Sequence, residues 1–115
     1  MAEPTLFTRI IAGEIPAEFL YQDELCVVIR DIKPQAPVHA LIIPRKPLSG
    51  IQVTQDEDRE LLGHLFLVAR QIARDEGIAD KGYRLVINAG EGGGQEVPHL
   101  HIHLLGGRQM LWPPG

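Results

Sequence analysis

The stretch VPHLHIHLLGG, residues 97–107, decides how the chain folds and where its chemistry lies. It carries three of the chain's five histidines at alternate positions, His99, His101 and His103. Successive side chains of a β-strand point to opposite faces of a sheet, so a strand here places the histidines on one face and the intervening apolar residues on the other. We therefore expect the apolar face to lie under a helix and the histidines to line the open face.

Apart from a long helix described below, the remainder of the chain predicts one short helix and four more strands. TLFTRIIAGEIP, from residue 5, has apolar residues at helical spacing followed by Gly13 and Pro16, which is typical of a short N-terminal helix. EFLYQDELCVVIRDI predicts two strands joined as a hairpin at Asp23 and Glu24. HALIIP and GYRLVINAG predict two further strands, and HLHIHLL supplies the last.

A long helix is predicted from Thr54 to Glu76. The Thr54 hydroxyl is the expected N-cap, with Glu57 three residues on as its capping-box partner. Gly77 is the expected left-handed stop. The apolar stripe recurs at spacings of four, three and four residues, at Leu61, Leu65, Val68 and Ile72.

These elements predict an α+β fold, an antiparallel sheet of about five strands with the long helix packed on one face. A chain of 115 residues with 44% hydrophobic content suits a single domain over residues 1–115.

The net charge of -4 disfavours a nucleic-acid partner. No stretch approaches the roughly 20 apolar residues of a membrane helix. Cys26 is the single cysteine and the start lacks the features of a secretory signal, so we expect a cytosolic protein.

Three interpretations compete for the histidine face. A solvated polar face explains a lone histidine better than three beside a triple glycine. A metal site needs ligands that converge, but the outer two histidines lie about 13 Å apart along a strand, and no CxxC, HExxH or carboxylate cluster supplies the missing ligands. The third interpretation is phosphate chemistry, because a neutral imidazole can attack phosphorus and its neighbours can donate hydrogen bonds to the oxygens.

The loop EGGGQEV favours phosphate chemistry. Glycines before the histidine strand let backbone amides approach phosphate oxygens closely. The loop is not a P-loop, since no Gly-Lys-Ser/Thr follows and a strand comes next. Glycines alone are a weak signal, but together with the histidines they point more strongly to phosphate chemistry.

HLHIHLL resembles the signature of the histidine triad superfamily, in which histidines alternate with apolar residues. The likeness extends from about Leu6 to Gly115, and its main segments are similar to the histidine triad nucleotide-binding protein branch, the Hint-type phosphoramidases. These segments are LFTRIIAGEIPAEFLYQDE, RDIKPQAPVHALIIPRK, LLGHL, KGYRLVINAGEGGGQ and HLLGGRQMLWPPG. A galactose-1-phosphate uridylyltransferase carries glutamine where His103 stands, so the resemblance implies hydrolysis.

The resemblance implies roles for the histidines. His101 matches the nucleophile, which forms a covalent nucleotidyl-histidine that water cleaves. His103 and His39 match residues near the phosphate, and His99 matches the member that organises the site. His64, on the long helix, is expected to be structural. The resemblance implies neither a metal nor another cofactor.

It also implies a nucleotide-binding set. Asp31 matches the carboxylate that binds the ribose hydroxyls. Apolar positions around the base are matched by Leu6, Phe7, Ile10, Ile15 and Ile32. Contacts to the sugar and α-phosphate are matched by Asn88, Gly94, Gln95 and Val97. From the residues alone, the apolar positions also suit an ordinary core, and Asp31 and Asn88 also suit turns.

Two further positions bear on specificity. Glu96 stands where Hint-type proteins commonly carry serine or threonine beside the leaving group, so a carboxylate here is expected to alter leaving-group preference. Hint-type proteins are two-fold dimers that share one extended sheet, and their C-terminal segment reaches toward the partner's site. The resemblance therefore implies a homodimer in which Trp112 helps to shape that site.

The expected activity is hydrolysis of purine nucleoside phosphoramidates to a nucleoside monophosphate and an amine. Two alternatives stay open. One is a dinucleoside polyphosphate hydrolase of the same superfamily. The other is a nucleotide-binding regulatory module whose hydrolysis is incidental.

Overall fold

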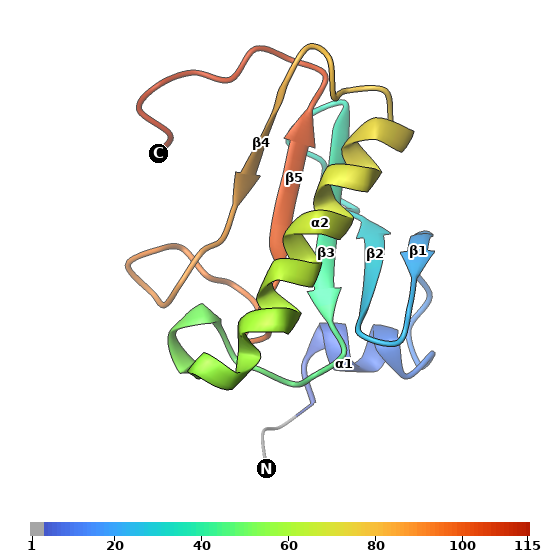
Figure 1. Ribbon diagram of the computed structural model, residues 1–115, viewed down its shortest axis with the longest axis vertical. Helices are drawn as coiled ribbons and strands as arrows, with labels where there is room; N and C mark the ends of the chain where they lie inside the picture. The colour runs from blue at the N-terminus through green and yellow to red at the C-terminus, as the bar shows by residue number, and fades with distance from the viewer. Residues whose placement is uncertain (1–3) are drawn as a thin grey trace.

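A computed structural model describes residues 4–115 and shows a five-stranded antiparallel sheet with a helix against each face (Figure 1). Residues 1–3 of the expected domain lie outside the described residues. The predicted α+β class is confirmed. The elements follow in this order: α1 (Leu6–Ile11), β1 (Phe19–Gln22), β2 (Cys26–Arg30), β3 (Val38–Pro44), the 3₁₀ turns η1 (Ile51–Val53) and η2 (Asp56–Asp58), α2 (Arg59–Asp75), β4 (Tyr83–Val86) and β5 (Ile102–Gly106).

The strand order places the last strand inside the sheet. The order is β1-β2-β3-β5-β4, so β5 lies between β3 and the edge strand β4. In the antiparallel register, His39 of β3 pairs with Leu105 and Leu41 pairs with His103. His39 and His103 are therefore diagonal neighbours on one face, within reach of each other's side chains.

The long helix covers the apolar face of the sheet. Leu65, Val68 and Ile72 of α2 are buried in one cluster with strand residues that alternate inward. Leu100, Ile102 and Leu104 belong to the same cluster. The alternation predicted for the histidine stretch is confirmed, and it leaves the histidines on the face opposite α2.

The short helix packs on that opposite face. Phe7 and Ile10 of α1 form a second buried cluster with residues of β2 and β3, among them Leu41. A capping box begins the helix, because the Thr5 hydroxyl accepts from the Thr8 N–H and the Thr8 hydroxyl accepts from the Thr5 N–H. The predicted N-terminal helix is confirmed.

The long helix begins later than predicted. The Thr54 hydroxyl donates to the Ile51 carbonyl and closes η1, so it does not cap α2. A capping box begins the preceding turn η2, where the Gln55 N–H donates to the Asp58 carboxylate at 2.9 Å, and Asp58, the N-cap of α2, makes no side-chain cap hydrogen bond to the helix. Thr54 and Glu57 were the wrong pair because η1 and η2 displace the helix start to Arg59. Gly77 follows the helix with φ +74°, as predicted.

Two strands are shorter than predicted. HLHIHLL is a strand only from Ile102, because the N–H groups of His99 and Leu100 donate to the carbonyls of Val97 and Leu48 rather than to β3. GYRLVINAG pairs only over Tyr83–Val86, since within residues 4–115 β4 pairs with β5 alone, and β5 begins at Ile102. None of the helices within residues 4–115 has the length and apolar character needed to cross a bilayer.

Candidate active site

His101 is held so that one ring nitrogen is free. Its Nδ1 lies 2.7 Å from the His99 carbonyl oxygen, which can only accept, so Nδ1 carries a proton. The His99 ring in turn places Nε2 2.8 Å from the Pro44 carbonyl and donates to it. His99 therefore anchors the segment to the end of β3, and a neutral His101 keeps its lone pair on Nε2.

His39 and His103 form a second, connected pair. The His39 Nε2 and the His103 Nδ1 lie 2.9 Å apart. The backbone N–H of Gln35 donates to the His39 Nδ1 at 3.0 Å. The His101 and His103 rings meet edge to face with centroids 4.9 Å apart, so His39, His103 and His101 form one contiguous group.

Burial keeps these histidines neutral. Desolvation lowers the pKa of His39, His99 and His101, and it lowers the pKa of His103 to about 4 with help from the neighbouring imidazoles. The carboxylate of Asp31 opposes the shift at His101 and His103 but does not overcome it. At neutral pH the face offers lone pairs and N–H donors rather than positive charge.

Asp31 builds a turn, as its sequence position predicts, and also approaches the histidine group. Its Oδ1 accepts from the Lys33 N–H at 2.8 Å and so builds the turn after β2. Its Oδ2 lies 3.4 Å from the His39 Nε2. The turn therefore directs one carboxylate oxygen toward the histidine group.

The apolar positions predicted around the base divide into two groups. Phe7 and Ile10 are buried, and the Phe7 ring contacts His101 edge to face with centroids 4.9 Å apart. Ile15 packs against the same cluster. Leu6 is 45% exposed and Ile32 86% exposed, so these two offer free apolar surface to a ligand.

The glycine-rich loop is braced by Gln95. The Gln95 side chain accepts from the Gly90 N–H and donates to the carbonyls of Ser49 and Val97, so its amide is occupied within the protein. Gly94 has φ +78°, a conformation that favours glycine. Val97 packs against the α1 cluster, whereas Glu96 is exposed. Asn88 is partly buried, and no described hydrogen bond links it to the histidines.

The C-terminal segment lies away from α1, beside β4 (Figure 1). Arg84 of β4 donates to the Leu111 carbonyl at 2.9 Å and holds the segment there. Leu111 is 73% exposed and Trp112 is 83% exposed. The described chain therefore does not bring Trp112 to its own histidines.

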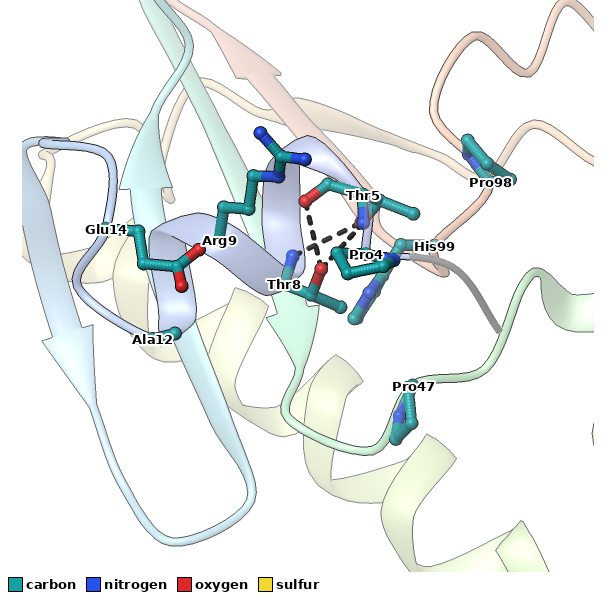
Figure 2. Close-up of a pocket in the computed structure, with 9 residues that line it drawn as sticks. All are labelled: Pro4, Thr5, Thr8, Arg9, Ala12, Glu14, Pro47, Pro98 and His99. Atoms are coloured by element: carbon teal, nitrogen blue, oxygen red, sulfur yellow. Dashed lines mark hydrogen bonds between the residues drawn. The ribbon is translucent and has the colours of Figure 1, made fainter. Parts of the chain in front are cut away.

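A hollow of about 270 Å³ lies beside α1 and reaches His99 (Figure 2). His39, His101 and His103 do not line it, so it is separate from the group that these three histidines form. Its lining consists of Pro4, Thr5, Thr8, Arg9, Ala12, Glu14, Pro47, Pro98 and His99.

One group of metal-type donors lies within the site, but its hydrogen bonds do not suit an ion. Asp31, His39 and His103 have ligand atoms within 4.8 Å of one another. A metal on the His39 Nε2 would require the ring proton on Nδ1, where the Gln35 N–H already donates. Two donors would then face each other, so these residues do not fit a metal ion.

A second donor group lies under α2 and is already satisfied. The Asp23 carboxylate accepts from the Tyr21 hydroxyl, from His64 and from the backbone N–H groups of Leu25 and Cys26. Burial raises the pKa of the Cys26 thiol to about 12. His64 joins the helix to the hairpin turn, which agrees with the structural role expected for it.

Sequence reasoning missed the Gln35 N–H and the Pro44 carbonyl. Both are backbone groups, so their residue types carry no signal. The one indirect signal is KPQAP, a rigid turn placed directly before the strand that bears His39.

Comparison with known proteins agrees with this fold. The HIT domain family model matches residues 12–110. An uncharacterized HIT-like protein of Synechococcus elongatus is 54% identical over 115 residues, all of both chains. The 14 kDa zinc-binding protein of Zea mays is 52% identical, over 97% of this chain and 88% of that protein. The crystal structure of a HIT family hydrolase from Legionella pneumophila has a TM-score of 0.96 at 52% identity, over 97% of this chain and 100% of that one. The chain therefore belongs to the HIT domain family.

Proposed function

We propose that this protein is a Hint-type hydrolase that converts purine nucleoside phosphoramidates to a nucleoside monophosphate and an amine. The observation that carries the proposal is the geometry of His101. Its Nδ1–H is fixed on the His99 carbonyl, and burial lowers its pKa, so a lone pair is available on Nε2 at neutral pH.

The proposed reaction has two displacements at phosphorus. The His101 Nε2 forms a bond to phosphorus as the P–N bond breaks, and the amine leaves with a proton taken from the medium. Water then attacks the nucleotidyl-histidine, its oxygen joins phosphorus, and its proton is released as His101 regains the lone pair. One water is consumed in each cycle.

The nucleotide is assigned to the open face beside α1. Asp31 is the proposed ribose ligand, and the exposed side chains of Leu6 and Ile32 are proposed to contact the base. Hydrogen bonds within the protein occupy the Gln95 amide, so Gln95 is proposed to act indirectly. It braces the loop, and the loop's backbone is proposed to bind the phosphate.

We also propose that the active form is a homodimer. The exposed Leu111 and Trp112 present an apolar surface that a second copy of the chain would cover. A two-fold arrangement would give each dimer two sites, each completed by the partner's C-terminal segment.

The maize relative is named as a zinc-binding protein, but we propose that this chain does not bind zinc at the histidine group. The hydrogen bond from the Gln35 N–H leaves His39 without the proton arrangement that a metal ligand needs. Activity is accordingly expected to survive exhaustive treatment with a chelator.

The decisive experiment compares adenosine 5′-phosphoramidate with diadenosine polyphosphates, using wild type, His101→Asn and the matched control His64→Asn. We expect faster turnover of the phosphoramidate, a nucleotidyl adduct on acid-quenched wild type in mass spectrometry, and a loss on the order of 10³ or more for His101→Asn only. Preference for the polyphosphate would favour the alternative hydrolase. Binding without any adduct or turnover would favour the regulatory module.

A further inference from the structure

The loop before β3 controls a ring proton. Gln35 lies four residues before His39, and its backbone N–H donates to the His39 Nδ1 at 3.0 Å. His39 is 5% exposed, so water does not replace this donor freely. Burial also lowers the pKa of His39, so the ring is neutral and carries one proton.

The position of that proton follows from the contacts. Because Nδ1 of His39 accepts from Gln35, the proton lies on Nε2. Both neighbours of Nε2 are acceptors in this arrangement, the His103 Nδ1 at 2.9 Å and the Asp31 Oδ2 at 3.4 Å. The shorter contact makes His103 the main acceptor, and a neutral His103 must then carry its own proton on Nε2.

We propose that the Gln35 backbone N–H is the positioning group that sets these two tautomers, so that His103 presents an N–H to the substrate's phosphoryl oxygens. The opposite tautomer of His103 would present a lone pair, which repels an anionic oxygen. The catalytic consequence rests on the function proposed above, whereas the tautomers themselves exist without substrate.

One contact within the loop and two from the segment after β5 hold it in place. The Arg108 Nε donates to the Gln35 carbonyl at 2.9 Å, and the Gln35 side chain donates to the Lys33 carbonyl at 3.0 Å. Gly107 follows β5 with φ +88°, and a Cβ there would lie 2.9 Å from the Pro37 ring. The segment after β5 therefore supports the loop that directs His39 and His103.

The test compares Gln35→Pro with Gln35→Ala. Proline removes the N–H, whereas alanine removes the side chain and keeps the N–H. Ring ¹⁵N shifts of the ligand-free protein report each tautomer. We expect the proton on Nε2 of His39 and His103 and on Nδ1 of His101 in wild type and Gln35→Ala. In Gln35→Pro we expect His39 and His103 to become tautomer mixtures while His101 is unchanged.

Unchanged tautomers in Gln35→Pro would overturn the proposal, and so would a proton on Nδ1 of His39 in wild type. Should the proline variant fail to fold, the wild type decides through the scalar coupling across the N–H···N bond between the Gln35 nitrogen and the His39 Nδ1. Presence of this coupling supports the proposal, and its absence refutes it.

Phosphoramidate turnover is the second readout. We expect kcat/KM to fall about tenfold at most in Gln35→Pro relative to Gln35→Ala, which is less than for complete loss of one oriented donor because a tautomer mixture keeps the His103 Nε2–H in part of the molecules. Tautomers that behave as expected in a protein without phosphoramidate turnover would reject the proposed function and leave the positioning role intact.

Discussion

At the scale of single residues, burial makes the protonation of the histidines a property of the fold. The neutral form of His101 is the proposed nucleophile, and desolvation lowers its pKa from the ordinary value of about 6.5. Protonation on lowering the pH removes the lone pair. We therefore expect the acid limb of the kcat/KM profile to lie below pH 6.5. A limb centred at or above that value, with the fold intact by circular dichroism, would contradict the neutral nucleophile.

Glu96 is the residue expected to tune the leaving group. It is exposed at the end of the glycine-rich loop, so its carboxylate is free to attract ammonium groups and repel anionic ones. Glu96→Ser should change the ratio of kcat/KM values across a series of cationic, neutral and anionic amines, by several-fold between the extremes. Glu91→Ser, an equal charge change in the same loop, is the control. Identical ratios in Glu96→Ser and wild type would place the side chain away from the leaving group.

At the scale of elements, the periodic segments were predictable and their ends were not. The alternation in HLHIHLL predicted both faces of the sheet, because the apolar residues of a half-buried strand face the core. Leu100, Ile102 and Leu104 lie in that core, as predicted. The predicted start of α2 was too early because the cap signal at Thr54 is local, whereas the Thr54 hydroxyl closes η1 and Asp58 accepts from the Gln55 N–H in η2.

The choice of cap can be measured. Asp58 is buried, accepts from the Gln55 N–H and pairs with Lys46 at 2.6 Å, whereas Thr54 only closes η1. Asp58→Ala should therefore lower the melting temperature by several degrees, and Glu57→Ala should leave it nearly unchanged. Equal effects of the two substitutions would show that the observed box does not stabilise the helix start.

The site was predictable to the same extent. The face that bears His99, His101 and His103 and the glycine loop before it follow from residue types, whereas the roles of His39 and Asp31 are implied only by the resemblance and stay predictions. The ring protons of His101 and His99 are set by the carbonyls of His99 and Pro44, which accept from them, and that of His39 by the Gln35 N–H, which donates to its Nδ1. Backbone groups are identical at every position, so only the folded chain reveals which of them meet a histidine.

At the scale of the whole molecule, the exposed C-terminal segment predicts action across a dimer. In a mixed dimer, one subunit carries His101→Asn with an intact tail, and the other carries His101 but lacks residues 109–115. We expect the surviving site to show full-length leaving-group selectivity, because its tail comes from the inactive partner. Truncated selectivity, measured with the same amine series, would place the tail on its own subunit.

The single cysteine gives the molecule an internal reporter of its own opening. Cys26 is fully buried between α2 and the sheet, and burial raises its thiol pKa to about 12. An alkylating reagent reacts with thiolate in contact with solvent, so modification has to wait until the helix lifts or the hairpin separates. The labelling rate of the unaltered protein therefore measures how often the core opens. A nucleotide that binds only the closed form should slow that rate in proportion to its occupancy, which turns a side chain with no part in the chemistry into a direct gauge of ligand affinity.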